Sequence, residues 1–249
     1  MTMKQFEGRV ALITGAGSGM GRATAILLAQ RGAAVALVGR RESRLNDAVT
    51  EITAAGGSAL ALPGDVSRPE DVERAVARTL ENYGALHHAV NNAGVSGDFT
   101  PLVDMTPAQW QRTIDIDLTS LFYGIKYEIP AILAAGGGSI VNVSSVFADR
   151  GGPTADYSSA KHGIRGLTRT AAIQFGRQGV RVNELQPGVI DTEMTQANPE
   201  GAQKVADTGI PLGRVGTGDE VAKAIAFLLS DDASYINGAH LAVDGGFLA

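Results

Sequence analysis

Short apolar runs rich in β-branched residues recur along this chain, and a stretch with helical periodicity follows almost every one of them. The runs are apolar throughout and do not alternate with polar residues, which predicts strands that are buried on both faces. Strands that alternate with helices in this way are typical of parallel sheets covered by helices on both sides. We expect strands at residues 9–14, 34–38, 58–62, 86–90, 139–143, 180–185 and 240–243.

The stretches between these strands carry the helical pattern. We expect helices from the glycine-rich loop to about residue 31, and at 42–55, 69–83, 107–133, 155–177 and 219–230. Residues 193–209 are small and polar, so we expect an irregular or weakly helical segment there.

Regular alternation of strands and helices is also typical of an eight-stranded barrel, but a glycine-rich loop after the first strand favours an open sheet. The 249 residues are within the range of a single domain, and the sequence has no low-complexity linker and no visible repeat. We therefore expect an α/β fold with one domain, residues 1–249. Its Rossmann-type, doubly wound, seven-stranded parallel sheet would lie between two layers of helices.

The composition excludes several classes of function. Lys and Arg number 21 against 26 Asp and Glu, and this net charge of −5 argues against a nucleic-acid partner, which needs clustered cations. The chain has no cysteine, which excludes a disulfide scaffold, a Cys nucleophile and thiolate metal sites. There is no apolar run of about 18 residues, and the polar start lacks the pattern of a secretory signal. We expect no membrane span and a cytoplasmic location.

The first expected strand ends in the loop TGAGSGMG, residues 14–21, which leads into a helix. Gly15 and Gly19 let the backbone approach a pyrophosphate closely, and the helix N-terminus beyond offers free N–H groups and partial positive charge. Glycine-rich turns are common, but the place of this loop between a strand and a helix favours a dinucleotide site. We expect cofactor contacts from Gly15, Ser18, Gly19 and Met20.

The end of the second strand is where such a site contacts the adenosine ribose. NAD sites have an acidic residue there, whereas NADP sites have space and positive charge. Here Gly39 is followed by Arg40 and Arg41, so no carboxylate repels a 2′-phosphate and a guanidinium can bind it with two hydrogen bonds. We predict NADP(H) as the cofactor, bound by Arg40 and Arg41. The alternative is that both arginines are only solvated and that the cofactor is NAD(H).

Tyr157 and Lys161 lie four residues apart on an expected helix and therefore share one face. An ammonium beside a tyrosine stabilises the phenolate, which makes Tyr157 a usable general acid or base for a carbonyl and alcohol pair. Ser144 ends a strand 13 residues earlier, at the edge where open α/β sheets bind ligands, and its hydroxyl can hydrogen-bond a substrate oxygen. A tyrosine and a lysine at this spacing are frequent by chance. The pair is evidence for a catalytic site because it occurs together with the glycine loop.

The order of these motifs resembles the short-chain dehydrogenase/reductase family in its single-domain form, over nearly the whole chain. Besides the glycine loop and the three residues Ser144, Tyr157 and Lys161, the resemblance rests on NNAG at residues 91–94, PGVIDT at 187–192 and AVDGG at 242–246. It implies that Asp65 and Val66 contact the adenine and that the 187–192 segment touches the nicotinamide. Together, the cofactor contacts that the resemblance implies beyond the glycine loop are Asp65, Val66, Asn92, Tyr157, Lys161, Gly188, Ile190 and Thr192.

The resemblance also implies hydride transfer between NADP(H) and a carbonyl or secondary alcohol, as in a carbonyl reductase or alcohol dehydrogenase. Tyr157 would pass the proton, Lys161 would hold the nicotinamide ribose and stabilise the phenolate, and Ser144 would position the carbonyl oxygen. The Tyr-Lys spacing is shorter than that of the family's enoyl reductases, which favours carbonyl over alkene reduction. A homotetramer is implied as well.

Other functions stay open at this point. One is an NAD-dependent sugar, steroid or cyclic alcohol dehydrogenase of the same fold, and another is a 3-oxoacyl thioester reductase. A protein that binds the cofactor without turnover is disfavoured because Tyr157 and Lys161 are both present.

Asp117 departs from the family pattern, which has an asparagine at this place in the fourth helix. The asparagine is thought to hold a water largely through its backbone carbonyl, which an aspartate keeps. The carboxylate would either lie beside Lys161 and partly cancel the field of the ammonium at Tyr157 or point away.

The remaining expectations concern the substrate, a small carbonyl or alcohol. Gln186 is predicted either to touch the substrate or to pack within the protein. Residues 193–213 are expected to close over the substrate, with Met194 as the main apolar group near the start of the segment. His87 and His88 point to opposite faces of a strand, which argues against a shared metal, and we expect no metal site.

Overall fold

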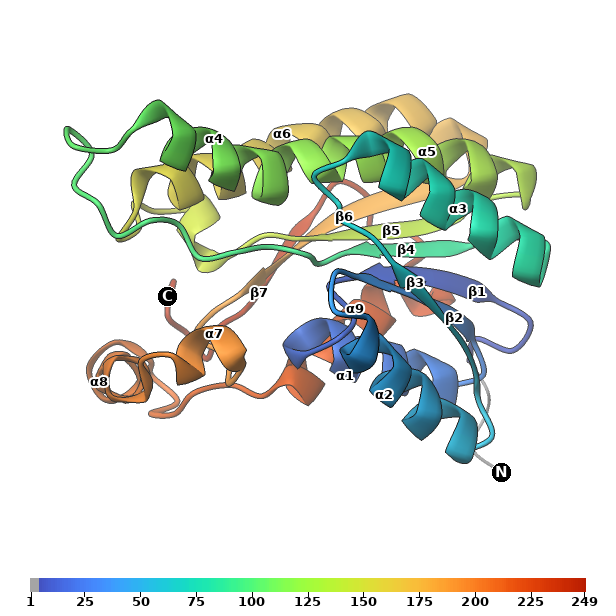
Figure 1. The fold of residues 1–249 in the computed structure, drawn as a ribbon, viewed down its shortest axis with the longest axis horizontal. Coiled ribbons are helices and arrows are strands. Elements are labelled where there is room, and N and C mark those ends of the chain that lie inside the picture. The colour runs from blue at the N-terminus through green and yellow to red at the C-terminus, as the bar shows by residue number, and fades with distance from the viewer. Residues whose placement is uncertain (1–4) are drawn as a thin grey trace.

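The computed structural model describes residues 5–249, and its centre is a sheet of seven parallel strands in the order β3-β2-β1-β4-β5-β6-β7 (Figure 1). This confirms the predicted doubly wound sheet with helices on both faces. The strands are β1 (Val10–Thr14), β2 (Ala34–Gly39), β3 (Ser58–Pro63), β4 (His88–Asn91), β5 (Gly138–Val143), β6 (Val180–Pro187) and β7 (His240–Val243).

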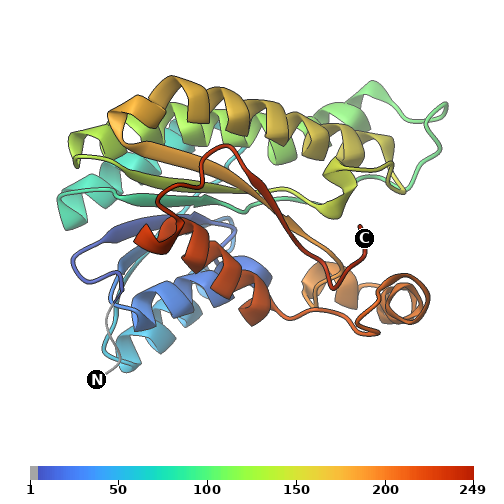
Figure 2. The same cartoon turned by 180° about the vertical axis from the view of Figure 1, so that it is seen from behind.

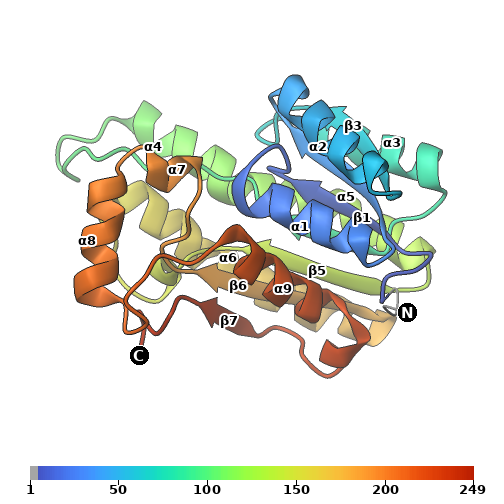
Figure 3. The same ribbon diagram turned by 90° about the horizontal axis from the view of Figure 1, so that it is seen from below.

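Helices cover the sheet in two layers, which Figures 1 and 2 show above and below the strands. One layer holds α1 (Gly19–Gln30), α2 (Glu42–Ala54) and α9 (Gly218–Leu229), and Figure 3 shows α1 and α9 side by side. The other layer holds α3 (Pro69–Tyr83), α4 (Pro107–Ile114), α5 (Ser120–Ala134) and α6 (Ala155–Phe175). Short 3₁₀ turns lie at Val146–Ala148, Gly176–Gln178 and Asp231–Ala233.

The two layers bury separate hydrophobic cores. In β1, Ala11 and Ile13 belong to the core that includes Ile225 of α9, whereas Leu12 between them belongs to the core that includes Ile132 of α5. Because successive side chains of a strand point to opposite faces, both faces of β1 must be apolar. This explains why the strands read as continuous apolar runs.

The helix expected at 107–133 is interrupted by one wider turn. The π-helical segment η1 (Asp115–Thr119) joins α4 to α5. Such a turn holds an additional residue and is often found at functional sites. It contains Asp117, whose side chain is completely buried.

Of the two alternatives predicted for residues 193–209, irregular or weakly helical, the structure has the helical one, in the form of two helices. They are α7 (Glu193–Gln196) and α8 (Pro199–Gly209). Thr192 caps α7, and the side chain of Asn198 accepts a hydrogen bond from Gly201 N at the start of α8. These caps satisfy backbone N–H groups and compensate for a composition that has little apolar surface. Among the helices of residues 5–249, none combines the length and the hydropathy that crossing a membrane requires.

Candidate active site

A cleft of about 690 Å³ lies at the carboxyl edge of the sheet, where the loops after six of the seven strands meet. All but one of the residues predicted to form the site line this cleft. They are Gly15, Ser18, Gly19, Met20, Arg40, Arg41, Asp65, Val66, Asn92, Asp117, Ser144, Tyr157, Lys161, Gly188, Ile190, Thr192 and Met194.

Gln186 is the exception. Its side chain is fully buried, and its amide nitrogen lies 2.9 Å from Asp149 Oδ2. Gln186 therefore packs within the protein, which was the alternative to a contact with the substrate.

The glycine loop has the backbone that its sequence predicts. Gly15 and Gly19 have φ angles of 66° and 52°, in the left-handed region that favours glycine. A Cβ on Gly21 would lie 2.4 Å from Gly15 O, so no larger residue fits between the loop and α1. The loop is further held by Asn92, whose Nδ2 donates to Thr14 O at 3.0 Å.

This loop fits the phosphates of a dinucleotide. The glycines have no side chains that would keep a phosphate away from the backbone. The loop also leads into the N-terminus of α1, and a helix N-terminus favours the binding of anions. Asn92 Oδ1 is buried and has no hydrogen-bond partner among residues 5–249. The loop and the unsatisfied amide oxygen therefore match the donors and acceptors of a nicotinamide dinucleotide.

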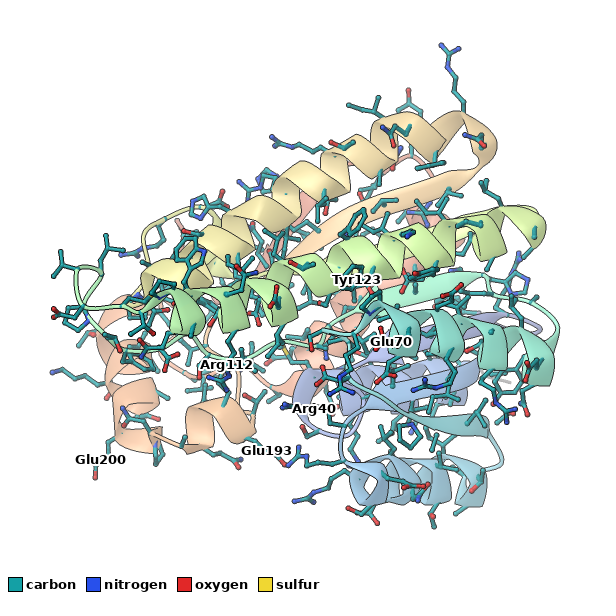
Figure 4. The ribbon with its side chains drawn as sticks, turned by 45° about the horizontal axis from the view of Figure 1, so that its top comes forward. Arg40, Glu70, Arg112, Tyr123, Glu193 and Glu200 are labelled. Carbon is teal, nitrogen blue, oxygen red and sulfur yellow. The ribbon has the colours of Figure 1, made fainter. Side chains whose placement is uncertain are left out.

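The two arginines after β2 differ in their surroundings. Arg41 donates to Glu193 Oε2 at 2.6 Å and to Ser18 Oγ at 3.2 Å. The hydrogen bond from Arg41 holds the pKa of Glu193 below its usual value. Arg40 is exposed and forms no ion pair with any of residues 5–249. Figure 4 shows Arg40 at the end of β2 and Glu193 at the start of α7.

Asp65 and Val66 follow β3 at the same edge of the sheet. Asp65 Oδ1 accepts hydrogen bonds from the backbone and the hydroxyl of Ser67, at 3.0 and 2.7 Å. The backbone N–H of Asp65 donates to Asp71 Oδ2 at 2.8 Å and holds the pKa of Asp71 below its usual value. These hydrogen bonds fix the turn that brings Asp65 and Val66 to the cleft.

Tyr157 and Lys161 share one face of α6, as their spacing predicts. Lys161 Nζ lies 5.2 Å from the centroid of the Tyr157 ring, and Lys161 is almost fully buried. The edge of the Tyr157 ring also packs against Phe147, with 6.4 Å between the ring centroids. The phenol is therefore held beside a cation at the edge of the cleft.

Asp117 reaches the same lysine from η1. Its Oδ2 lies 3.2 Å from Lys161 Nζ, and its Oδ1 accepts a hydrogen bond from Val95 N at 2.8 Å. The alternative that the side chain points away is therefore wrong. Burial lowers the pKa of Lys161, but the charges around it, with the carboxylate of Asp117 first, together offset this and raise the pKa above its usual value. Burial raises the pKa of Asp117.

Ser144 follows β5 and has an unexpected partner. Its hydroxyl lies 2.5 Å from Glu184 Oε1, and Glu184 Oε2 lies 3.1 Å from Arg165 Nε. Arg165 also pairs with Asp149, and the two carboxylates raise its pKa above the usual value. Glu184 is a residue of β6 that the sequence patterns do not single out.

Asp156 is a second residue that the sequence analysis missed. Its Oδ2 accepts from Thr113 Oγ1 at 2.6 Å and from Asp98 N at 3.1 Å, so it ties α4 and the loop after β4 to the start of α6. Burial raises the pKa of Asp156, but its hydrogen bonds hold it below the usual value. An acidic residue in the first turn of a helix is the signal that points to it.

Two further expectations concern metals and the closing segment. Residues 5–249 contain no group of three or more His, Asp or Glu side chains that could hold a metal ion. Met194 is half exposed at the cleft, and Glu193 and Thr195 beside it line the cleft as well. The start of segment 193–213 therefore forms one wall of the site.

A doubly wound sheet, a glycine cradle for a dinucleotide and a buried lysine beside a tyrosine together define a nicotinamide-dependent oxidoreductase. A family model described as enoyl-(acyl carrier protein) reductase matches residues 15–248. The chain belongs to the short-chain dehydrogenase/reductase family.

Individual relatives match almost end to end. A cyclohexanol dehydrogenase of Acinetobacter sp. (strain SE19) is 44% identical over 98% of this chain and 96% of its own length. A 3-oxoacyl-[acyl-carrier-protein] reductase of Thermotoga maritima is 38% identical over 98% of this chain and 99% of its own length. Among solved structures, a levodione reductase superposes with a TM-score of 0.92 at 38% identity, covering 97% of this chain and 98% of that one.

Proposed function

We propose that this oxidoreductase transfers a hydride between NADP(H) and a cyclic secondary alcohol or the corresponding ketone. The observation that carries the proposal is the meeting of Tyr157, Lys161 and Ser144 at one cleft beside the glycine cradle. The similarity to a cyclohexanol dehydrogenase supports a cyclic alcohol as the substrate.

A nicotinamide held at the glycine loop would supply the hydride in ketone reduction and accept it in alcohol oxidation. Tyr157 takes a proton from the alcohol oxygen during oxidation and returns it during reduction, which is general acid–base catalysis. The ammonium of Lys161 stabilises the phenolate that Tyr157 becomes when it gives up its proton. Ser144 hydrogen-bonds the substrate oxygen and keeps it at the tyrosine.

The preference for NADP(H) is supported by the end of β2. Gly39, Arg40 and Arg41 line the cleft there, and no carboxylate stands among these three residues. Arg40 is the more direct candidate for a 2′-phosphate, because Arg41 is engaged by Glu193. Glu193 adds a negative charge nearby, so the preference depends on Arg40.

A 3-oxoacyl thioester reductase is the second candidate, favoured by the similarity to the Thermotoga maritima reductase. Alkene reduction is disfavoured because Tyr157 and Lys161 are only four residues apart. The expected cytoplasmic location and homotetrameric assembly stay predictions.

A substrate panel separates these functions. Cyclohexanol, a linear secondary alcohol, their ketones and a 3-oxoacyl thioester are each assayed with NADP(H) and NAD(H), with the reduced nicotinamide followed by its absorbance. We expect the highest kcat/KM for cyclohexanol or cyclohexanone with NADP(H). A higher kcat/KM for the thioester would establish the second candidate, and a preference for NADH would contradict the cofactor assignment.

A further inference from the structure

Arg41 meets Glu193 at the end of the cleft that lies beyond β2, where a fold of this kind takes the adenosine ribose. Glu193 is the first residue of α7, and both residues line the cleft. Arg41 Nη2 lies 2.6 Å from Glu193 Oε2, and Arg44 Nη2 lies 3.8 Å from the other carboxylate oxygen. The segment after β6 thus brings a carboxylate to the place where the end of β2 has none.

The start of α7 is fixed beside the glycine loop. A Cβ on Gly19 would lie 3.1 Å from Thr192 Cγ2, so Thr192 packs directly against the loop. Thr195 Oγ1 accepts a hydrogen bond from Thr192 N at 2.9 Å and donates one to Ile190 O at 2.7 Å. These contacts hold the backbone on either side of Glu193, whose side chain then reaches Arg41.

The pair uses the part of Arg41 that a phosphate needs. Arg41 Nη2 donates to Glu193 and also to Ser18 Oγ at 3.2 Å, so both of its N–H groups are engaged. A guanidinium binds a phosphate best through two parallel N–H groups. Two edges of a guanidinium offer such a pair, Nη1 with Nη2 and Nε with Nη2, and both include Nη2. Arg41 therefore has no free pair of donors while Glu193 is bound to it.

A stronger anion can open the contact between Arg41 and Glu193. The two side chains are 54% and 46% exposed, and an exposed ion pair of this kind contributes little to stability. A phosphate monoester carries a charge of about −2 at neutral pH and offers three acceptor oxygens. A 2′-phosphate at this end of the cleft therefore competes with Glu193 for Arg41, whereas a 2′-hydroxyl does not.

We propose that Glu193 is a specificity-determining residue that occupies Arg41 in place of a 2′-phosphate and so limits the preference of the site for NADP(H) over NAD(H). Arg40 forms no ion pair with any of residues 5–249, so nothing competes with the phosphate there. Arg41 adds its two hydrogen bonds only when Glu193 gives way. The role of Glu193 rests on the proposed function, since it assumes that the adenosine ribose lies at the end of β2.

Glu193→Gln keeps the shape of the side chain and removes its charge. The glutamine can bind Arg41 only through its amide oxygen, in a neutral hydrogen bond that a phosphate displaces more easily. We therefore expect this variant to bind a 2′-phosphate about tenfold more tightly than wild type does, which is the effect of one additional hydrogen bond to a charged group.

Two adenosine nucleotides without a nicotinamide isolate the 2′-phosphate. Adenosine 2′,5′-bisphosphate carries it, and adenosine 5′-monophosphate does not. Isothermal titration calorimetry at one low ionic strength gives the dissociation constant of each for wild type and Glu193→Gln. We expect the bisphosphate to bind about tenfold more tightly to the variant and the monophosphate to bind equally to both proteins. An unchanged affinity for the bisphosphate, or an equal gain for the monophosphate, would overturn the inference.

An Arg41→Ala background separates competition for Arg41 from charge repulsion. If Glu193 acts by occupying Arg41, Glu193→Gln gives no gain for the bisphosphate in this background. A gain that persists there means that the carboxylate only repels the phosphate, which overturns the inference. Glu81→Gln is the matched control, because Glu81 also pairs with an exposed arginine, Arg78, at 3.0 Å but lies on α3. It is expected to leave both affinities unchanged.

The two nucleotides also distinguish a failure of the proposed function from a failure of the role of Glu193. If wild type binds the bisphosphate no more tightly than the monophosphate, the preference for NADP(H) is contradicted, and Glu193 is still judged by the change in Glu193→Gln. If wild type prefers the bisphosphate and the variant binds it equally well, the cofactor assignment stands and the role of Glu193 is overturned. No alcohol or ketone is present, so the substrate class does not affect either result.

Discussion

The ammonium of Lys161 lies 3.2 Å from a carboxylate oxygen of Asp117, and both side chains are almost completely buried. The ammonium also lies 5.2 Å from the ring centroid of Tyr157. One cation therefore serves two groups, and the negative charge of Asp117 reduces the field that the cation exerts at the phenol. A neutral side chain at position 117 would leave that field uncompensated.

Asp117→Asn is expected to move the pH profile of alcohol oxidation to lower pH. Oxidation needs the phenolate, which a nearby carboxylate disfavours, so the rate rises at lower pH once the carboxylate is removed. Asp117 also raises the pKa of Lys161 against the effect of burial, so the variant should lose activity again at high pH as Lys161 deprotonates. The measurement is kcat/KM against pH, and profiles that superimpose would show that the charge of Asp117 has no effect.

Tyr157→Phe is expected to lower kcat by about 10²–10⁴-fold, which is the usual size of general acid–base catalysis. The ring keeps its contact with Phe147, so NADPH binding should be nearly retained. Steady-state kinetics and a fluorescence titration with NADPH measure the two effects. Tyr235→Phe, at a fully exposed tyrosine, is the matched control. Turnover close to that of wild type would remove Tyr157 from the mechanism.

Arg40→Ala is expected to weaken NADPH binding by about 1.5–3 kcal/mol, the range of a hydrogen bond to a charged group, and to leave NADH binding unchanged. KM values for both cofactors, compared between wild type and variant, measure this selectivity. Arg78→Ala on the exposed face of α3 is the control. An equal loss for NADPH and NADH would mean that Arg40 does not bind the 2′-phosphate.

Gly21→Ala is expected to weaken cofactor binding at least about tenfold and to destabilise the protein by about 1–3 kcal/mol through overpacking. The added Cβ would lie 2.4 Å from Gly15 O and 2.6 Å from Asn92 Nδ2, so the glycine loop would have to move. Gly166→Ala is the opposite case, because no atom lies within 4 Å of its Cβ position on α6. We expect this control to stabilise the protein by about 0.5–1 kcal/mol in thermal unfolding. A normal cofactor affinity in Gly21→Ala would contradict the role given to the loop.

His88 is expected to make the protein sensitive to acid. Burial lowers the pKa of His88 to about 3, from 6.5 for an unperturbed histidine. Between these values the unfolded chain binds a proton that the folded chain does not, so the free energy of unfolding falls with decreasing pH. This slope is at most about 1.4 kcal/mol per pH unit.

Urea unfolding of His88→Phe at several pH values tests this expectation. The phenyl ring should keep the edge contact with Phe6, and Ser139 keeps its hydrogen bond to Leu229 O. Between pH 6.5 and 4 the free energy of unfolding should depend less steeply on pH in the variant than in wild type. The difference in slope should correspond to the uptake of about one proton on unfolding. A change of the same size in His162→Gln, at an exposed histidine, would show that the effect does not come from burial.

The sequence predicts most of the fold because the strands are apolar on both faces and the turns between them are rich in glycine. It does not predict η1, since a wider turn leaves no mark in the apolar pattern of residues 107–134. For α8 it leaves an irregular segment as an alternative to a helix, because the segment has few apolar residues. Asn198 as a cap and Pro199 as a first residue are the signals that favour the helix.

The candidate site likewise has parts that the sequence predicts and parts that it does not. The glycine loop and the Tyr157 and Lys161 pair are local patterns, so spacing alone places them. The contact between Ser144 and Glu184 depends instead on how β5 pairs with β6, where Ser144 N donates to Leu185 O at 2.8 Å. Because a strand side chain changes face with each residue, this register decides whether Glu184 reaches Ser144 at all.

The wide turn at η1 separates the position of Asp117 from the packing of the helices on either side. A π turn lets a helix absorb one inserted residue while the helical segments on either side stay aligned. In this chain Thr113 before the turn and Leu121 after it both remain buried, so α4 and α5 keep their packing. The wide turn carries Asp117 to Lys161. Deleting one residue from this turn is therefore expected to move the carboxylate away from Lys161 while α4 and α5 keep their packing, so the chemistry of the site can be changed here without rebuilding the scaffold.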